Sequence, residues 1–254
     1  MGLWSREHAV TLIPAIGVMV LLGILCRFVL CKREEKTRMI PLQVIAVLLV
    51  LLEIGKQALS LRQGYDLYHL PFHYCSIYIF AVPVMAFYRG KHKTVVRETV
   101  FGLCAALFLI MLIYPELIYG SGSIKAFFSS YFSFHTVVFH NLVMLALVLM
   151  IGLNVPAPTT KAAVKPLSLF LLAFCAVSAA MAQLLKTNYA NFYSCNVPPL
   201  EALRVSMKGV LGYGLTQFIY VLAVTAVTVL FTLMFYGIFR FVRKLVAGKI
   251  PAKV

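Results

Sequence analysis

The sequence has few acidic residues and few charged residues of any kind. Of its 254 residues, 12% are charged, and eight Asp and Glu stand against 23 Lys and Arg. A soluble domain has about 25% charged residues, so the composition excludes an ordinary soluble protein. The chain is 62% hydrophobic, with repeated apolar runs of about 20 residues that predict transmembrane helices. We therefore predict an all-α polytopic integral membrane bundle.

The cysteines lack the spacings that bind metals or carry redox pairs. The six cysteines form no CxxC pair and no metal-knuckle pattern. Four fall inside or at the ends of apolar runs, where cysteine usually behaves as a small hydrophobic residue. The other two, Cys75 and Cys195, lie near one predicted face of the membrane. A disulfide between them is one interpretation.

The apolar runs predict one domain of seven transmembrane helices spanning residues 1–254. No internal repeat is visible, and no loop is long enough for a soluble domain. The predicted spans are His8–Leu30, Met39–Leu61, Leu70–Tyr88, Thr94–Pro115, Tyr131–Leu153, Val164–Leu185 and Gly209–Phe239.

The Lys and Arg residues predict the orientation of these spans. Fifteen of the 23 lie in the loops after spans one, three, five and seven, and six lie on the opposite side. Positive residues favour the cytoplasmic side, so we predict an outside N-terminus, a cytoplasmic C-terminus and a location in the cell membrane. The same rule accounts for the net charge of +15, and we predict no nucleic-acid partner.

Two outer connections differ from the other loops. Glu116 to Ser130 contains Gly, Ser and aromatic residues and is predicted to form a short interfacial or re-entrant segment. Lys186 to Lys208 is the longest loop, and its Asn, Tyr and paired Pro residues predict an ordered cap.

The stretch LPFHYCSIYIF, residues 70–80, carries the strongest chemical signal. Pro71 is suited to the first position of a helix, because its missing N–H would have no partner there. His73 and Cys75 would then lie in the first turn and a half. The helix dipole at that position favours a thiolate, so Cys75 is a candidate nucleophile.

Other ionisable residues lie in the same half of the membrane, where such side chains are costly and rarely incidental. His135 and His140 lie in the outer half of span five, and either is predicted to reach the sulfur of Cys75. Glu53 and Lys56 lie three residues apart on span two and predict a neutralised pair on one helical face. Alternatively, Glu53 orients the catalytic histidine.

Three functions fit this pattern. In the first, Cys75 and a histidine of span five transfer an acyl group from a lipid ester. In the second, His73, His135 and His140, with or without Cys75, bind zinc in a lipid hydrolase. In the third, the same residues line a transport path or bind haem, although no repeated halves indicate a transporter.

Three segments also resemble a known family. LPFHYCSIYIF, FHTVVFHNLVMLAL and TNYANFY followed by Pro-Pro and LEALR are similar to the YwaF and transmembrane protein 164 family, from span two to span seven. The resemblance implies a seven-helix fold and a cysteine that carries an acyl group between phospholipids, without a metal or another cofactor. It implies Cys75 as the acyl acceptor and His140 as its partner, with His135, Asn188 and Tyr189 in supporting positions.

We therefore predict a membrane-bound phospholipid acyltransferase or transacylase, with lipid hydrolysis as a related activity. Its substrates are a phospholipid donor and a lysophospholipid acceptor. Because both are lipids, no nucleotide or coenzyme A motif is required. The predicted catalytic residues are Cys75 and His140, and the predicted supporting residues are His135, His73, Asn188, Tyr189 and Glu53.

Overall fold

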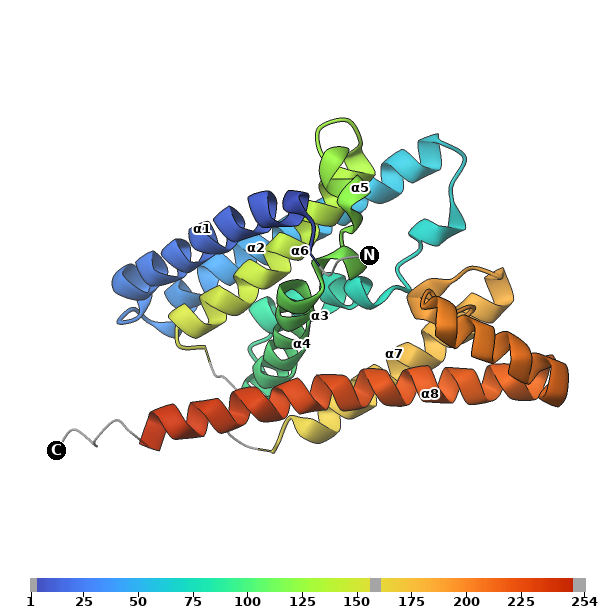
Figure 1. The fold of residues 1–254 in the computed structure, drawn as a ribbon. Helices are drawn as coiled ribbons and strands as arrows, with labels where there is room; N and C mark the ends of the chain where they lie inside the picture. Colours follow the sequence, from blue (N-terminus) through green and yellow to red (C-terminus); the bar gives the residue numbers. More distant parts are fainter. Residues whose placement is uncertain (1–3, 156–160, 249–254) are drawn as a thin grey trace.

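The structure is a computed structural model that describes residues 4–155 and 161–248. The ends of the predicted 1–254 domain lie outside these ranges. Every regular element in the described ranges is a helix (Figure 1), in agreement with the predicted fold class. The elements are α1 (Arg6–Leu30), α2 (Glu35–Arg62), η1 (Leu67–His69), η2 (Tyr74–Ser76), α3 (Ile77–Phe87), α4 (Lys93–Ile113), η3 (Pro115–Leu117), α5 (Gly120–Lys125), α6 (Tyr131–Gly152), α7 (Val164–Leu185), η4 (Tyr189–Asn191) and α8 (Pro198–Gly248), where η marks a 3₁₀ helix.

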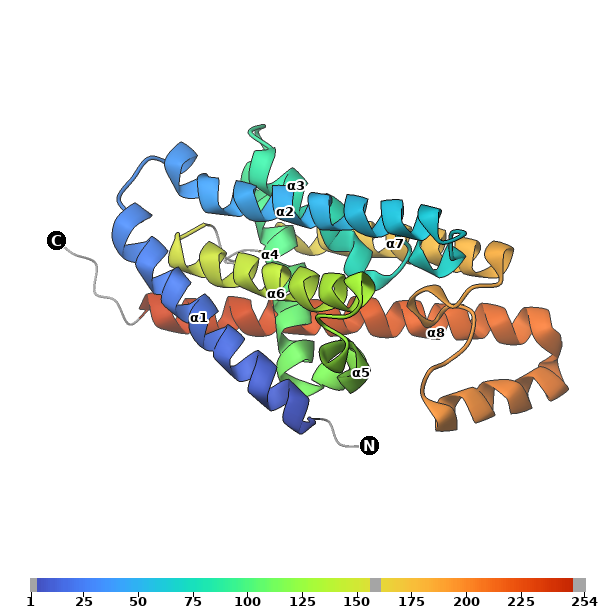
Figure 2. The ribbon, with the colours of Figure 1, turned by 90° about the horizontal axis from the view of Figure 1, so that it is seen from above.

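Six of the described helices are long and apolar enough to cross a membrane. These are α1, α2, α4, α6, α7 and α8, and each matches a predicted span. Helix α4 is the most buried of the six, and it runs across the other long helices in the middle of the molecule (Figure 2). The polytopic helical bundle predicted from the apolar runs is therefore confirmed.

The predicted third span is shorter than expected. The chain is extended at Leu70 and His73, and α3 contains only 11 residues. At about 1.5 Å per residue this helix rises roughly 16 Å, half of a hydrocarbon core of about 30 Å. The prediction that Pro71 opens a helix is wrong. Within the extended segment, His73 Nε2 lies 3.0 Å from the carbonyl oxygen of Tyr68, five residues earlier.

Helix α8 begins earlier than the predicted last span. It starts at Pro198, so the second half of the predicted Lys186–Lys208 cap is helical. The backbone leaves helical geometry at Gly212, where φ is 75°, a value that only glycine adopts at low cost. The chain doubles back there, and the short first part of α8 runs beside its long second part (Figures 1 and 2).

The helices are packed closely in the region where α1 and α6 end and α2 begins. A Cβ atom on Gly152 would lie 2.6 Å from the carbonyl oxygen of Gly23, so the two backbones are in contact. Glu35 pairs with Lys93 and with the buried Arg97, each at 2.7 Å. We call this region, defined by Gly23, Gly152, Glu35, Lys93 and Arg97, the closed end of the bundle.

Candidate functional site

At the opposite end of the bundle the helices surround a cavity of about 650 Å³. We call this region the cavity end. Its walls come from the second half of α2, the first half of α6, the segments before α3 and after α7, and from α3, α4, α7 and α8. Six predicted site residues line the cavity, although they are far apart in the sequence: Cys75, His140, His135, His73, Asn188 and Glu53. The seventh, Tyr189, does not line it.

Cys75 is the middle residue of the 3₁₀ turn η2, directly before Ser76, the N-cap of α3. Cys75 therefore precedes the helix α3. The prediction from the sequence, which placed it in the first turn and a half of that helix, is wrong. Its side chain is half-buried and faces the cavity. Neither Cys75 nor Cys195 forms a disulfide, so the proposed bridge between them is absent and both thiols are free.

The two histidines of α6 have different neighbours. His140 Nδ1 lies 2.6 Å from the carbonyl oxygen of Thr136, which only accepts hydrogen bonds, so the proton is on Nδ1 and Nε2 carries the lone pair. His135 Nε2 lies 3.2 Å from Glu53 Oε2, close enough for an ion pair when the ring is protonated but outside hydrogen-bond geometry. In the described residues neither ring hydrogen-bonds to Cys75, but all three side chains line the same cavity.

The predicted Glu53–Lys56 pair is present at 2.8 Å, and both side chains are largely buried. Gln57 donates a second hydrogen bond to the same carboxylate oxygen at 2.7 Å. The charge of Glu53 is therefore balanced on one oxygen, and the other oxygen faces His135.

Sequence reasoning missed the residues that tie this pair to the loop before η2. Gln57 also donates to the carbonyl oxygen of His69 at 2.7 Å and accepts from the hydroxyl of Tyr65 at 2.6 Å. The His69 ring stacks on Phe132 of α6 with centroids 4.3 Å apart. No local pattern marks these residues, because each partner comes from a different element.

The segment after α7 forms an ordered cap, as predicted. Asn188 Oδ1 accepts hydrogen bonds from the backbone N–H groups of Tyr193 and Ser194, at 3.2 and 3.1 Å. The next turn contains two left-handed residues, Ala190 with φ 49° and Asn191 with φ 63°. Asn188 therefore shapes the loop that lines one wall of the cavity.

Tyr189 supports the site from behind. It is fully buried, and its hydroxyl donates a hydrogen bond to the carbonyl oxygen of Leu67. Its ring packs edge-on against Phe72 and His73, with centroids 5.3 and 5.4 Å away. Burial raises the pKa of this hydroxyl, which keeps it protonated as a donor. Tyr189 thus positions the backbone around His73.

The lining of the cavity is divided by polarity. Polar side chains come from α2, the start of α6 and the two loops, including Lys56, Tyr68 and Asn196. Apolar side chains come mainly from α3, α4, α7 and α8: Ile79, Leu103, Ala106, Leu107, Ile110, Leu171, Val227 and Phe231. Such a cavity suits an amphipathic ligand, with its polar part among the imidazoles and amides.

A comparison with models of protein families matches the TMEM164 family over residues 3–237. The chain belongs to the TMEM164 family. This confirms the family resemblance seen in the sequence and, with the long apolar helices, identifies a membrane protein. No curated protein and no solved structure matches the chain.

The candidate metal ligands of this TMEM164 family member do not form a cluster. Residues 4–155 and 161–248 contain no group of three or more His, Cys, Asp or Glu side chains placed to hold a metal ion. His135, one of the zinc ligands in the second interpretation, faces the carboxylate of Glu53.

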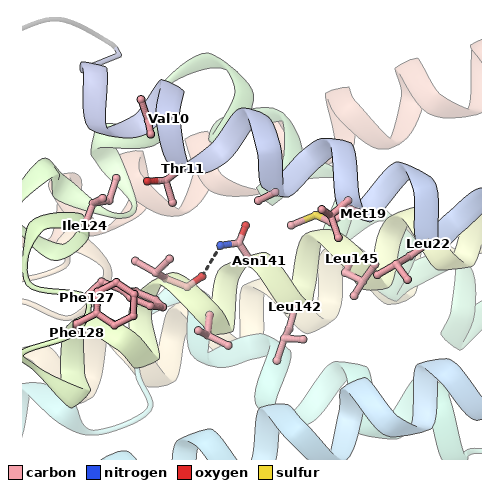
Figure 3. A pocket seen from close by; sticks show the side chains of 14 residues that line it. Val10, Thr11, Met19, Leu22, Ile124, Phe127, Phe128, Asn141, Leu142 and Leu145 are labelled. Carbon is pink, nitrogen blue, oxygen red and sulfur yellow. Dashed lines mark hydrogen bonds between the residues drawn. The ribbon is translucent and has the colours of Figure 1, made fainter.

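This TMEM164 family member also has a second hollow, which sequence reasoning missed. An apolar groove of about 570 Å³ lies between α1 and α6 and is bordered by the segment around α5 (Figure 3). Asn141 provides a polar group in its wall, and its Nδ2 donates to the carbonyl oxygen of Val137 at 2.9 Å. His140 lines the main cavity and Asn141 lines the groove, so α6 separates the two hollows.

Proposed function

We propose that this protein is a phospholipid acyltransferase that moves an acyl chain through a thioester on Cys75. The observation that carries the proposal is the content of the main cavity: a free thiol, an imidazole with its Nε2 lone pair available, and an amphipathic lining. A thiol and an imidazole are sufficient for acyl transfer between esters.

In the first half of the reaction, His140 Nε2 takes the proton of Cys75. The sulfur attacks the ester carbonyl carbon of the donor phospholipid, a C–S bond forms and the C–O bond to glycerol breaks. The imidazolium returns its proton to the leaving lysophospholipid. In the second half, the hydroxyl of an acceptor lysophospholipid attacks the thioester, and the thiol is regenerated.

The turn that carries Cys75 supports this chemistry. Its hydrogen bond runs from the N–H of Ser76 to the carbonyl oxygen of His73. The N–H groups of Tyr74 and Cys75 open the turn and have no acceptor within it. They are donors of the kind that stabilises the oxyanion of a tetrahedral intermediate.

The division of the lining supports a lipid substrate. The polar walls are suited to a glycerophosphate head group, and the apolar walls on α4, α7 and α8 are suited to acyl chains. The excess of Lys and Arg on the opposite side favours a site in the outer half of the cell membrane, with a cytoplasmic C-terminus.

The test is to trap the acyl-enzyme. Purified protein in detergent is incubated with a labelled phosphatidylcholine, and intact-protein and peptide mass spectrometry locate the label. We expect a thioester on Cys75 that is lost in Cys75→Ser and in His140→Ala, while Cys31→Ser, at a half-buried cysteine outside the cavity lining, retains it.

Addition of a lysophospholipid should then move the label to that lipid. Release of free fatty acid instead would assign a hydrolase. Absence of label from Cys75 in the wild type, with lipid turnover intact, would overturn the proposal.

A further inference from the structure

The wall of the main cavity contains one lysine, to which the chemistry proposed above gives no task. Among the described residues that line the cavity, Lys56 is the only Lys or Arg and Glu53 is the only Asp or Glu. Their two charges cancel, so the lining is neutral as a whole when its histidines are neutral. Lys56 is then the one fixed positive charge that a ligand in this cavity meets.

Stability alone does not account for this pair. The side chains of Lys56 and Glu53 are only 14% and 10% exposed, and Lys56 Nζ lies 2.8 Å from Glu53 Oε1. Replacing a buried ion pair by apolar residues of similar volume is often neutral or stabilising, because both charges have lost their water. A pair of this kind in the wall of a cavity therefore points to a role in binding.

The ammonium group of Lys56 has donors to spare. It carries three N–H groups, and in the part of the chain that the structure describes Glu53 is its one partner. Gln57 donates to the same carboxylate oxygen at 2.7 Å, and is itself held by the Tyr65 hydroxyl and the His69 carbonyl oxygen. The carboxylate thus keeps a hydrogen bond when the ammonium turns, and two N–H groups of Lys56 are available to a ligand.

A phosphate group matches these donors. Hydrogen bonds between charged groups are roughly twice as strong as those between neutral groups, and lysine binds phosphate as a point charge. A zwitterionic phospholipid brings its own ammonium group, so ligand and lining together remain neutral. A diacylglycerol offers the lysine neutral oxygen atoms alone.

We propose that Lys56 binds the phosphate of the donor phospholipid and so makes the enzyme select phospholipids over neutral glycerolipids. The inference rests on the proposed function. A lipid held by its phosphate keeps its esters in the cavity that Cys75 also lines, with its acyl chains along the apolar walls. Lys56 acts in binding and takes part in no covalent step.

The experiment compares three donors that carry the same labelled acyl chain. Phosphatidylcholine has phosphate and choline, phosphatidic acid has phosphate without choline, and diacylglycerol has neither. Purified protein in detergent is incubated with each donor at a low lipid mole fraction, and the rate of thioester formation on Cys75 is measured. The ratio of rates between donors is taken within each variant, so a difference in the amount of folded protein cancels.

The variants remove the charge in two ways. Lys56→Met leaves Glu53 without its cation, whereas the double variant Lys56→Met with Glu53→Gln leaves no unpaired charge. Lys56→Arg retains the cation. Lys125→Met is the matched control, because Lys125 also pairs with a carboxylate, that of Glu7, but does not line the cavity.

We expect the wild type to react at least about tenfold faster with each phospholipid than with diacylglycerol, the size of one hydrogen bond to a charged group. Lys56→Met and the double variant should bring this ratio close to one by slowing the reaction of both phospholipids, with the diacylglycerol rate within about threefold of the wild type. Lys56→Arg should keep most of the preference, and Lys125→Met should match the wild type.

A wild type that uses diacylglycerol as fast as phospholipids would overturn the inference, as would an unchanged ratio in Lys56→Met. Equal slowing with all three donors in Lys56→Met and in the double variant would make the pair structural, and slowing with phosphatidylcholine alone would assign Lys56 to the choline end; both results contradict the inference. In each case the wild-type thioester, and the proposed function, would stand. A wild type that forms no thioester from any donor would instead overturn the proposed function, and the inference would fall with it.

Discussion

The closed end and the cavity end each hold a carboxylate paired with basic side chains, but only at the cavity end do these side chains line one of the two hollows. At the closed end, Lys93 and Arg97 bind one oxygen each of Glu35, and none of the three lines either of the two hollows described above. At the cavity end, Lys56 occupies one oxygen of Glu53, and the other faces a histidine that lines the cavity.

The same contrast holds for the pair of helices α1 and α6. Their backbones touch at Gly23 and Gly152, and farther along they separate around the apolar groove (Figure 3). Changes at the closed end should therefore alter stability, and changes at the cavity end should alter chemistry.

The largest effect is expected for Cys75→Ala. If the proposed function holds, the rate of acyl transfer should fall by roughly 10⁴-fold or more, as for other covalent nucleophiles. The melting temperature in detergent should change little, because the half-buried side chain borders a cavity. A large loss of stability with proportionate loss of activity would contradict the contrast between the two ends.

Glu35→Ala should give the opposite result. It leaves the Arg97 side chain, which is 4% exposed, without its carboxylate partner. Removing one member of a fully buried pair costs about 3–5 kcal/mol. Because Glu35 is 38% exposed, solvent screening makes the cost here smaller. The melting temperature should fall, and activity measured well below the melting temperature should be retained. Glu34→Ala, at the exposed neighbouring carboxylate, is the control and should have little effect.

Gly152→Ala should destabilise the contact between α1 and α6. The new Cβ would lie 2.6 Å from a backbone oxygen, and such overpacking costs about 1–3 kcal/mol. Gly17→Ala adds the same atom in α1 where no other atom lies within 4 Å, and should be neutral or slightly stabilising. Equal melting temperatures for the two variants would show that the helices do not touch there.

The smallest effect concerns pH. Burial, with the nearby charge of Lys56, lowers the pKa of His73 in the loop before η2 below its ordinary value of 6.5. The unfolded chain therefore binds a proton more readily than the folded one. Stability from this group is complete above pH 6.5 and is lost as the pH falls below it, towards the folded-state pKa.

His73→Gln should consequently reduce the fall in melting temperature on mild acidification. The measurement compares both proteins at neutral and at mildly acidic pH in one detergent. An unchanged acid sensitivity in the variant would show that His73 is not held in its neutral form.

The functional residues were only partly predictable. Their types and their shared half of the membrane follow from span positions, and six of the seven predicted residues line one cavity. The roles of Gln57 and His69 were not predictable, because their contacts join α2 to a loop without periodicity. The position of Tyr189 behind His73 likewise depends on how the cap folds back.

The amino-acid sequence by itself determined the helical membrane class and the positions of six spans, because burial in lipid requires long apolar helices whose backbone groups are paired internally. Only the tertiary structure decided that Cys75 lies in a 3₁₀ turn, that Glu53 lies beside His135, and that α1 and α6 part around a groove. Those features depend on contacts between residues far apart in the chain, and local propensity does not encode them.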